Sequence, residues 1–418
     1  MNIFETAKKI ILKVMINTGV EASEIFAIEL KTALNIEKRN IISLASLFFR
    51  NYYFIEQIGE ELFNDRSLKV IVPLGLVYLN LSYKNYVERA ASLDFLNGEL
   101  KKANFEFDEE KSKVFDDIII NRKAFKFKSL EDGGMQQASI IFNKPLWLTK
   151  MILNQHGFKV GMRALKAMSL IPNQYAILNP IKEFDQINNH YLMEFEKFDD
   201  YYLYNEKINI NRSKLIRENY FLELQLPLIK LVNSLPKLVN KEISFFTSYH
   251  SNVAFKFFGK YYKNNNLNYF SGNLENNYKA FESIKKSNLG RYFYHESSEK
   301  GLISHLTFKQ DLIFYMPEST NFEMFRKNSE KAITFNQKNI DKFINVQETG
   351  LDELSLYIDK GGILVYCVET LNLKESNLLI VNFLTKHSNF EIVKEETNFP
   401  YEDENGILYY AILRKTND

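Results

Sequence analysis

From about residue 215 to the C-terminus, short apolar segments alternate with amphipathic segments, and this alternation constrains the fold more than any other feature. The apolar segments have the length of strands and cover residues 243–249, 267–271, 291–295, 311–316, 362–368, 390–394 and 407–413. The amphipathic segments have the length of helices and cover residues 251–262, 274–287, 336–357 and 374–385. Strands that alternate with helices predict βαβ units and a parallel sheet. Because no helical segment separates the last two strands, we expect them to form an antiparallel hairpin.

The first 125 residues show helical periodicity almost throughout. Ile3, Ala7 and Ile10, for example, fall on one helical stripe. Residues 38–53 are apolar nearly all round, which is typical of a central buried helix, and a later helix is expected to end at a cap formed by Asn97 and Gly98. This part of the chain is expected to be an all-α bundle of about five to seven helices.

Shorter elements follow in the middle of the chain. Pro145 is typical of a helix start, His156-Gly157 of a helix end, and a second short helix is expected at 160–169. Residues 175–178 are predicted to be extended. The expected fold class is therefore α/β, with a helical domain at 1–125, a linker and small α+β subdomain at 126–215, and a doubly wound domain at 216–418.

Composition excludes several classes of protein. The 53 Lys and Arg residues nearly balance the 52 Asp and Glu residues, so any contact with nucleic acid must come from local patches. The chain has one cysteine, Cys367, which excludes an intrachain disulfide and a multi-cysteine zinc site, and its histidines lack metal-ligand spacing. No apolar run approaches the length that spans a bilayer. We expect a cytoplasmic protein with no metal and no membrane contact.

Three segments carry a resemblance to a known family. The segment N-K-P-L-W-L-T-K-M-I at 143–152 is followed by Y-A-I-L-N-P at 175–180 and, far downstream, by G-G-I-L-V-Y-C-V-E-T-L-N-L-K-E-S-N at 361–377. This set resembles the Sun/Nop family of ribosomal RNA cytosine 5-methyltransferases. The resemblance implies a NusB-like helical RNA-binding domain, a small middle subdomain and a class I, Rossmann-like methyltransferase domain that binds S-adenosylmethionine.

The cofactor-binding residues depart from the family pattern. The resemblance aligns the family's glycine-rich cofactor loop with residues 247–254, so its paired glycines become Ser251 and Asn252. The carboxylate that binds the ribose falls near Ser271, which is not an acid. What remains is a vestigial pocket, for which the candidate residues are Thr247, His250, Ser251, Asn252 and Ser271. We therefore expect no bound cofactor, or S-adenosylmethionine if the protein is an enzyme.

The catalytic residues depart as well. The two family cysteines align with Glu318 and Glu369, and the family aspartate aligns with Tyr315. Methylation of cytosine at carbon 5 begins with attack by a thiolate, which a carboxylate does not easily replace. Two alternatives stay open: Cys367 is a displaced nucleophile, or the two glutamates form a carboxylate pair that exchanges protons. Otherwise Cys367 is a buried strand residue and the glutamates are ordinary loop acids.

Two basic segments are candidate RNA contacts. Arg122, Lys123, Lys126 and Lys128 alternate with aromatic residues, where RNA contact and a structural linker are equally good interpretations. Lys256 and Lys260 share a helical face that can bind phosphates, although a solvated face is the commoner arrangement.

The sequence thus predicts a protein that binds ribosomal RNA or the small ribosomal subunit and no longer catalyses methyl transfer. The alternatives are an active rRNA methyltransferase with a rearranged site and a protein-interaction scaffold.

Overall fold

The structure is a computed structural model. The structure describes residues 3–17, 20–122, 125–128, 134–180, 182, 189–206, 210, 213–247, 251–261, 265–271, 291–294, 306, 308–402 and 406–417. The chain divides into two compact units, Met1–Leu170 with Met324–Asn336, and Ile171–Glu323 with Gln337–Asp418. The expected division near residues 125 and 215 stays a prediction.

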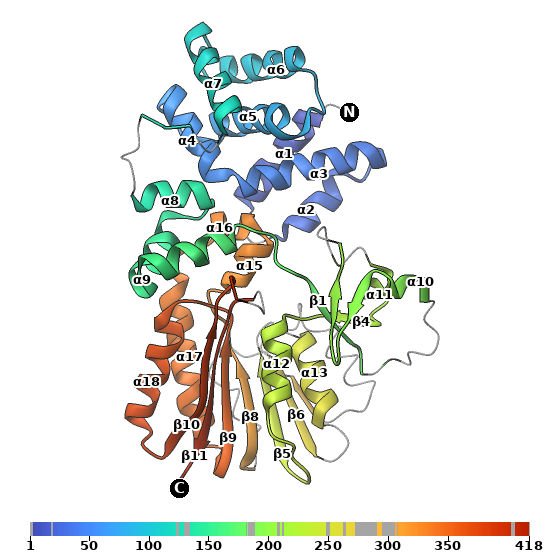
Figure 1. The fold of residues 1–418 in the computed structure, drawn as a ribbon, viewed down its shortest axis with the longest axis vertical. Helices are drawn as coiled ribbons and strands as arrows, with labels where there is room; N and C mark the ends of the chain where they lie inside the picture. The colour runs from blue at the N-terminus through green and yellow to red at the C-terminus, as the bar shows by residue number, and fades with distance from the viewer. Residues whose placement is uncertain are drawn as a thin grey trace. The chain divides into compact units, whose positions relative to one another are not determined.

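The first unit is helical (Figure 1). Its elements are α1 (Ile3–Ile16), α2 (Ala22–Glu29), α3 (Asn35–Arg50), α4 (Tyr52–Phe63), α5 (Leu68–Leu79), the π-helical turn η1 (Asn80–Lys84), α6 (Arg89–Lys102), α7 (Glu109–Asn121), α8 (Met135–Phe142), α9 (Leu146–Met168) and α16 (Ser329–Thr334). The helix α15 (Phe322–Lys327) leads into α16. The only tryptophan, Trp147, stacks on Phe335 with 5.6 Å between ring centroids.

The central helix of this bundle is α5. All residues from Val70 to Leu79 are buried, and a β-carbon on Gly75 would overlap Phe48 and Ile55 of the neighbouring helices. The expectation that 38–53 forms the buried central helix was wrong, because α3 buries one face only and Ile42 is exposed.

The sequence predicts a helix end at each of two glycines, Gly157 and Gly98. The expected break at Gly157 is confirmed, since Gly157 has φ 76° and interrupts α9. The expected end of a helix at Gly98 was wrong. The helix α6 runs on to Lys102, and the left-handed residue that follows it is Asn104, with φ 64°.

Asparagine occupies most left-handed positions in the described part of the chain. Seven of its eight non-glycine residues with positive φ are asparagines, namely Asn64, Asn85, Asn104, Asn143, Asn219, Asn240 and Asn321. Asparagine tolerates this conformation better than other side chains.

The second unit begins with a small antiparallel sheet of order β2-β3-β1-β4. Its strands are β1 (Tyr175–Leu178), β2 (Phe195–Lys197), β3 (Tyr202–Tyr204) and β4 (Phe221–Glu223), accompanied by the short helices α10 (Asn189–Leu192) and α11 (Lys214–Arg217). The predicted extended segment at 175–178 is therefore the strand β1, whereas the expected α+β subdomain at 126–215 stays a prediction.

The same unit contains a seven-stranded sheet of order β10-β11-β9-β8-β5-β6-β7 (Figure 1). Its strands are β5 (Glu242–Thr247), β6 (Asn266–Ser271), β7 (Arg291–Tyr294), β8 (Gln310–Met316), β9 (Ile358–Val368), β10 (Phe390–Asn398) and β11 (Leu408–Lys415). Strands β5 to β9 are parallel, and β10 and β11 form the expected antiparallel hairpin. The predicted Rossmann-like fold class is confirmed.

Helices cover both faces of this sheet. They are α12 (Leu226–Ser234), α13 (Ser251–Tyr261), α17 (Asn339–Ser355) and α18 (Asn377–Lys386), and a 3-10 turn (Leu373–Glu375) precedes α18. Successive residues of a strand point to opposite faces of the sheet and therefore pack in two different hydrophobic cores. Phe314 and Cys367 pack in the core that contains α12 and α13 residues, whereas Tyr315 and Tyr366 pack in the core that contains α17 and α18 residues.

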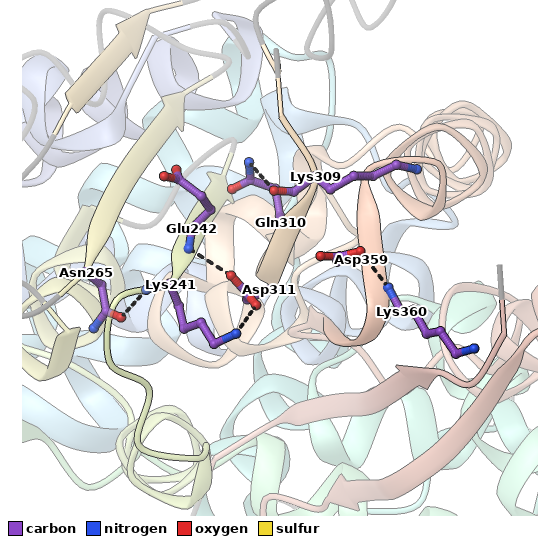
Figure 2. Close-up of polar contacts among 8 residues, drawn as sticks. All are labelled: Lys241, Glu242, Asn265, Lys309, Gln310, Asp311, Asp359 and Lys360. Atoms are coloured by element: carbon purple, nitrogen blue, oxygen red, sulfur yellow. Dashed lines mark hydrogen bonds and ion pairs between the residues drawn. The ribbon is translucent and has the colours of Figure 1, made fainter.

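Polar contacts hold the amino-terminal edge of the sheet (Figure 2). The Asp311 carboxylate accepts hydrogen bonds from Lys241 Nζ at 2.7 Å and from the backbone N–H of Glu242 at 3.0 Å. At the same edge Gly361 has φ 77°, and a β-carbon on Gly362 would lie 3.0 Å from the Gln310 carbonyl oxygen. The paired glycines of the 361–377 segment are thus required by backbone geometry, away from the carboxyl ends of the strands.

Candidate functional site

The carboxyl ends of parallel strands are where ligands bind in open α/β sheets. Here the connections after β8 and β9 are described, whereas 248–250 after β5 and 272–290 after β6 lie outside the described residues. The candidate site is therefore built from the segments 317–321 and 369–376.

Glu318 follows Pro317 directly after β8 and is half-buried. Its backbone carbonyl accepts a hydrogen bond from Gln347 Nε2 of α17 at 2.7 Å. One of the two glutamates that align with the family cysteines thus lies at the expected edge of the sheet.

Glu369 follows β9 and is only 3% exposed. Its carboxylate accepts a hydrogen bond from Gln225, the residue that precedes α12, and its backbone carbonyl accepts one from the N–H of Phe322 at 2.8 Å. Glu369 is therefore held in place as a buried structural acceptor.

A third carboxylate, Glu375, joins the two loops. It is fully buried, and its Oε1 accepts hydrogen bonds from the Thr320 N–H at 2.9 Å and from Gln347 Nε2 at 3.2 Å. Its Oε2 accepts bonds from the Thr320 hydroxyl at 2.6 Å and from Asn372 Nδ2 at 3.0 Å. Burial raises the pKa of Glu375, and these donors oppose the shift. Hydrogen bonds of Glu375 thus connect the loop that contains Glu318 to the loop that contains Glu369.

The single cysteine is not exposed at this edge. Cys367 is 0% exposed and packs in the core that contains α12 and α13 residues. Burial, together with the charge of Glu369, raises the pKa of its thiol well above the usual value. A buried thiol of high pKa is protonated at neutral pH and is a poor nucleophile.

Tyr315 points away from the edge as well. Its side chain is 2% exposed, and its hydroxyl donates a hydrogen bond to the Val346 carbonyl of α17 at 3.3 Å. Tyr315, which the resemblance aligns with an aspartate, is thus a core residue of the sheet.

The residues of the expected cofactor pocket are only partly described. Thr247 is buried at the end of β5, and Ser271 is the last residue of β6. Ser251 is the first residue of α13, and Asn252 Nδ2 donates to the Glu223 carbonyl at 2.7 Å. His250 lies outside the described residues. The side chain of Asn252, which the resemblance aligns with a glycine, is therefore hydrogen-bonded to the protein itself.

Known proteins share this fold. A protein designated PH0851 matches with TM-score 0.73 and 12% identity over 99% of both chains. A methyltransferase homolog protein from Pyrococcus horikoshii matches with TM-score 0.54 and 12% identity, over 68% of this chain and 100% of that one. NSun6 from Pyrococcus horikoshii, solved with SFG, matches with TM-score 0.55 and 13% identity, over 66% of this chain and 99% of that one. No protein-family model matches the sequence, and no curated protein does.

The chain has a methyltransferase fold. At these identities the likeness concerns the fold alone, and the match to PH0851 extends over nearly the whole chain. Among the described residues, no group of His, Cys, Asp and Glu has the geometry of a metal site. No described helix is long and apolar enough to cross a bilayer.

The predicted RNA-binding residues fall on both units. In the first unit, Arg122 lies over the Tyr83 ring and donates to the Ser82 carbonyl, Lys126 and Lys128 are exposed, and Lys123 is outside the described residues. In the second unit, Lys256 forms an ion pair with Asp200 at 3.0 Å. Lys260 Nζ donates to the carbonyls of Val232, Asn233 and Leu235.

Sequence reasoning missed three residues of the site: Glu375, Gln347 and Gln225. Glu375 could have been singled out, because it lies in the 361–377 segment on which the resemblance depends. The two glutamines carry no local signal, since their partners are distant in the sequence.

Proposed function

We propose that this protein binds RNA, as a member of the Sun/Nop group that retains the methyltransferase fold and does not transfer methyl groups. Its partner is ribosomal RNA or the small ribosomal subunit, and the helical unit is a NusB-like RNA-binding domain.

One observation carries the proposal: the two positions that require sulfur hold Glu318 and Glu369, while the only sulfhydryl of the chain is buried. A carboxylate is a weaker and harder nucleophile than a thiolate toward a pyrimidine ring. Glu369 is moreover engaged by Gln225, which favours a structural role.

The residues present do not fit the methyl donor. The strand β6 ends at Ser271, where a ribose-binding carboxylate is expected, and Asn252 stands where the backbone must approach the cofactor. A lost charged hydrogen bond weakens binding by about 1.5–3 kcal/mol, which is roughly ten- to hundredfold.

Calorimetric titration with S-adenosylmethionine tests the catalytic half of the proposal. We expect a dissociation constant in the millimolar range or no binding. Micromolar affinity, or methyl transfer to rRNA, would overturn it in favour of an active enzyme with a rearranged site.

Filter binding tests the RNA half. We expect preference for small-subunit rRNA over unrelated RNA, and weaker binding when Lys126 and Lys128 are both changed to glutamate. Lys31→Glu, at an exposed lysine of the same unit outside the predicted contacts, is the matched control. Equal affinity for all RNAs would contradict the proposal. Retention of a protein partner after nuclease treatment, without RNA binding, would favour a scaffold.

A further inference from the structure

A pocket of about 600 Å³ lies in the second unit between the small sheet and the helices α12 and α13. Ile177 and Leu178 of β1 contribute to its lining, together with Leu235 and Phe255. Its volume falls within the range of small-molecule sites, about 300–1,000 Å³.

The helix α13 approaches the small sheet closely at this point. A β-carbon on Gly259 would lie 3.2 Å from two ring atoms of Pro180, so the absence of a side chain allows the contact. Gly259 and Pro180 both line the pocket. The apolar wall of the pocket is therefore formed where α13 packs against the segment that contains β1 and Pro180.

The polar part of the pocket carries an excess of positive charge. Four lysines line it, Lys197, Lys237, Lys256 and Lys260, against two aspartates, Asp199 and Asp200. Asp200 forms an ion pair with Lys256 and also accepts a hydrogen bond from Asn233. Lys197 and Lys237 are exposed, and neither forms an ion pair with a described residue.

The environment of Lys260 reflects this excess. Its ammonium donates to three carbonyls at the end of α12, at 2.8, 2.8 and 2.6 Å. Burial, together with the charges of Lys256 and Lys237, lowers the pKa of Lys260 to about 8. An anion in the pocket would relieve the repulsion among these lysines.

We propose that this pocket binds a nucleotide, either free or as one residue of a single-stranded RNA. The base would pack against the apolar wall that includes Phe255, and the phosphate would lie between Lys197 and Lys237 at the rim. An apolar surface combined with cations is the arrangement by which proteins hold single-stranded nucleic acid without reading its sequence. Inorganic phosphate alone would leave the apolar wall unused.

The pocket is separate from the carboxyl edge of the large sheet. The helix α13 begins after β5, at that edge, and runs back toward the start of β6, so Lys260 near its end lies toward the amino-terminal edge. The proposal therefore does not rest on the proposed function, and a defect in the pocket should leave the carboxyl edge intact.

The test uses the full chain and calorimetric titration with adenosine monophosphate, a six-nucleotide single-stranded RNA, adenosine and inorganic phosphate. We expect the monophosphate or the RNA to bind, and adenosine and phosphate each to bind at least about tenfold more weakly. Binding of the monophosphate identifies a free nucleotide as sufficient, and binding of the RNA alone assigns the site to a strand.

The matched variants are Lys197→Glu with Lys237→Glu, and Lys360→Glu as the control. All three lysines are exposed, so the fold should be retained, and Lys360 lies at the amino edge of the sheet outside the pocket lining (Figure 2). We expect the double variant to lose about tenfold or more in affinity and the control to stay within about twofold. No binding by any probe, equal affinity for phosphate and monophosphate, or equal losses in both variants would overturn the proposal.

Discussion

The hydroxyl group of Tyr315 occupies the space where a β-carbon of residue 350 would lie, and this packing is possible because residue 350 is glycine. Tyr315 is thus accommodated by a glycine on α17. A tyrosine at this position needs a small residue above it, so the two positions form one packing unit.

Gly350→Ala is expected to destabilise the second unit by about 1–3 kcal/mol, because the added methyl group overlaps a buried ring. Urea unfolding followed by circular dichroism measures the change. Gly98→Ala is the matched control, since this exposed helical glycine has nothing within 4 Å of an added β-carbon and the change should stabilise by up to about 1 kcal/mol. If Tyr315→Leu does not reduce the cost of Gly350→Ala, the packing account is wrong.

Glu375→Gln is expected to cost about 1–3 kcal/mol at acid pH, because the amide nitrogen presents two N–H donors to partners that are themselves donors, whereas the protonated carboxyl presents one O–H and can still accept on both oxygens. Burial raises the pKa of Glu375 in the folded state, so its contribution is complete below the unfolded pKa of 4.5 and declines as pH rises through the folded pKa. The stability gap between wild type and variant should therefore narrow from pH about 4.5 upward. Urea unfolding across this range measures the gap, and a gap that widens would mean that the donors outweigh burial.

Cys367 is expected to resist thiol reagents in the folded protein, since it is fully buried and burial raises its pKa. Because it is the only cysteine, the time course of labelling with a chromogenic disulfide reports on this residue alone. In guanidinium chloride, where the protein is unfolded, labelling should go to completion. In buffer, the labelling rate of the folded protein should not exceed the rate at which the protein unfolds. Rapid labelling of the native protein would revive Cys367 as a nucleophile.

Lys144→Met is expected to stabilise the first unit at neutral pH. Burial, together with the charges of Arg50 and Arg326, lowers the pKa of Lys144 from 10.5 to about 7. The charged ammonium group therefore lowers the free energy of unfolding. This loss is absent above the unfolded pKa, grows as pH falls toward the folded pKa, and reaches a few kcal/mol. Unfolding followed by Trp147 fluorescence should show a gain at pH about 7 that vanishes near pH about 10.5. A gain that does not depend on pH would indicate packing alone.

Elements that depend on local periodicity were predictable from the sequence. Strands such as β8 and β9 follow apolar runs, and the kink at Gly157 follows from a residue that tolerates left-handed backbone. For the candidate site, the sequence predicts only its location. Glu318 and Glu369 follow the ends of two parallel strands, and these ends lie at one edge of the sheet.

Features that depend on distant partners were not predictable. The bonds of Glu375 to Thr320 and Gln347 join residues far apart in the sequence. The π-helical turn η1 accompanies the buried Asn80, whose side chain bonds the backbone of Tyr86 and Val87, and no propensity encodes that geometry.

The asparagines show that most left-handed positions in the described part of the chain do not require glycine. A coding sequence can consequently drift toward adenine and thymine, exchanging glycine codons for asparagine codons, while each turn keeps its course. Recognition of distant relatives by their glycine signatures would then fail even where the backbone path is unchanged.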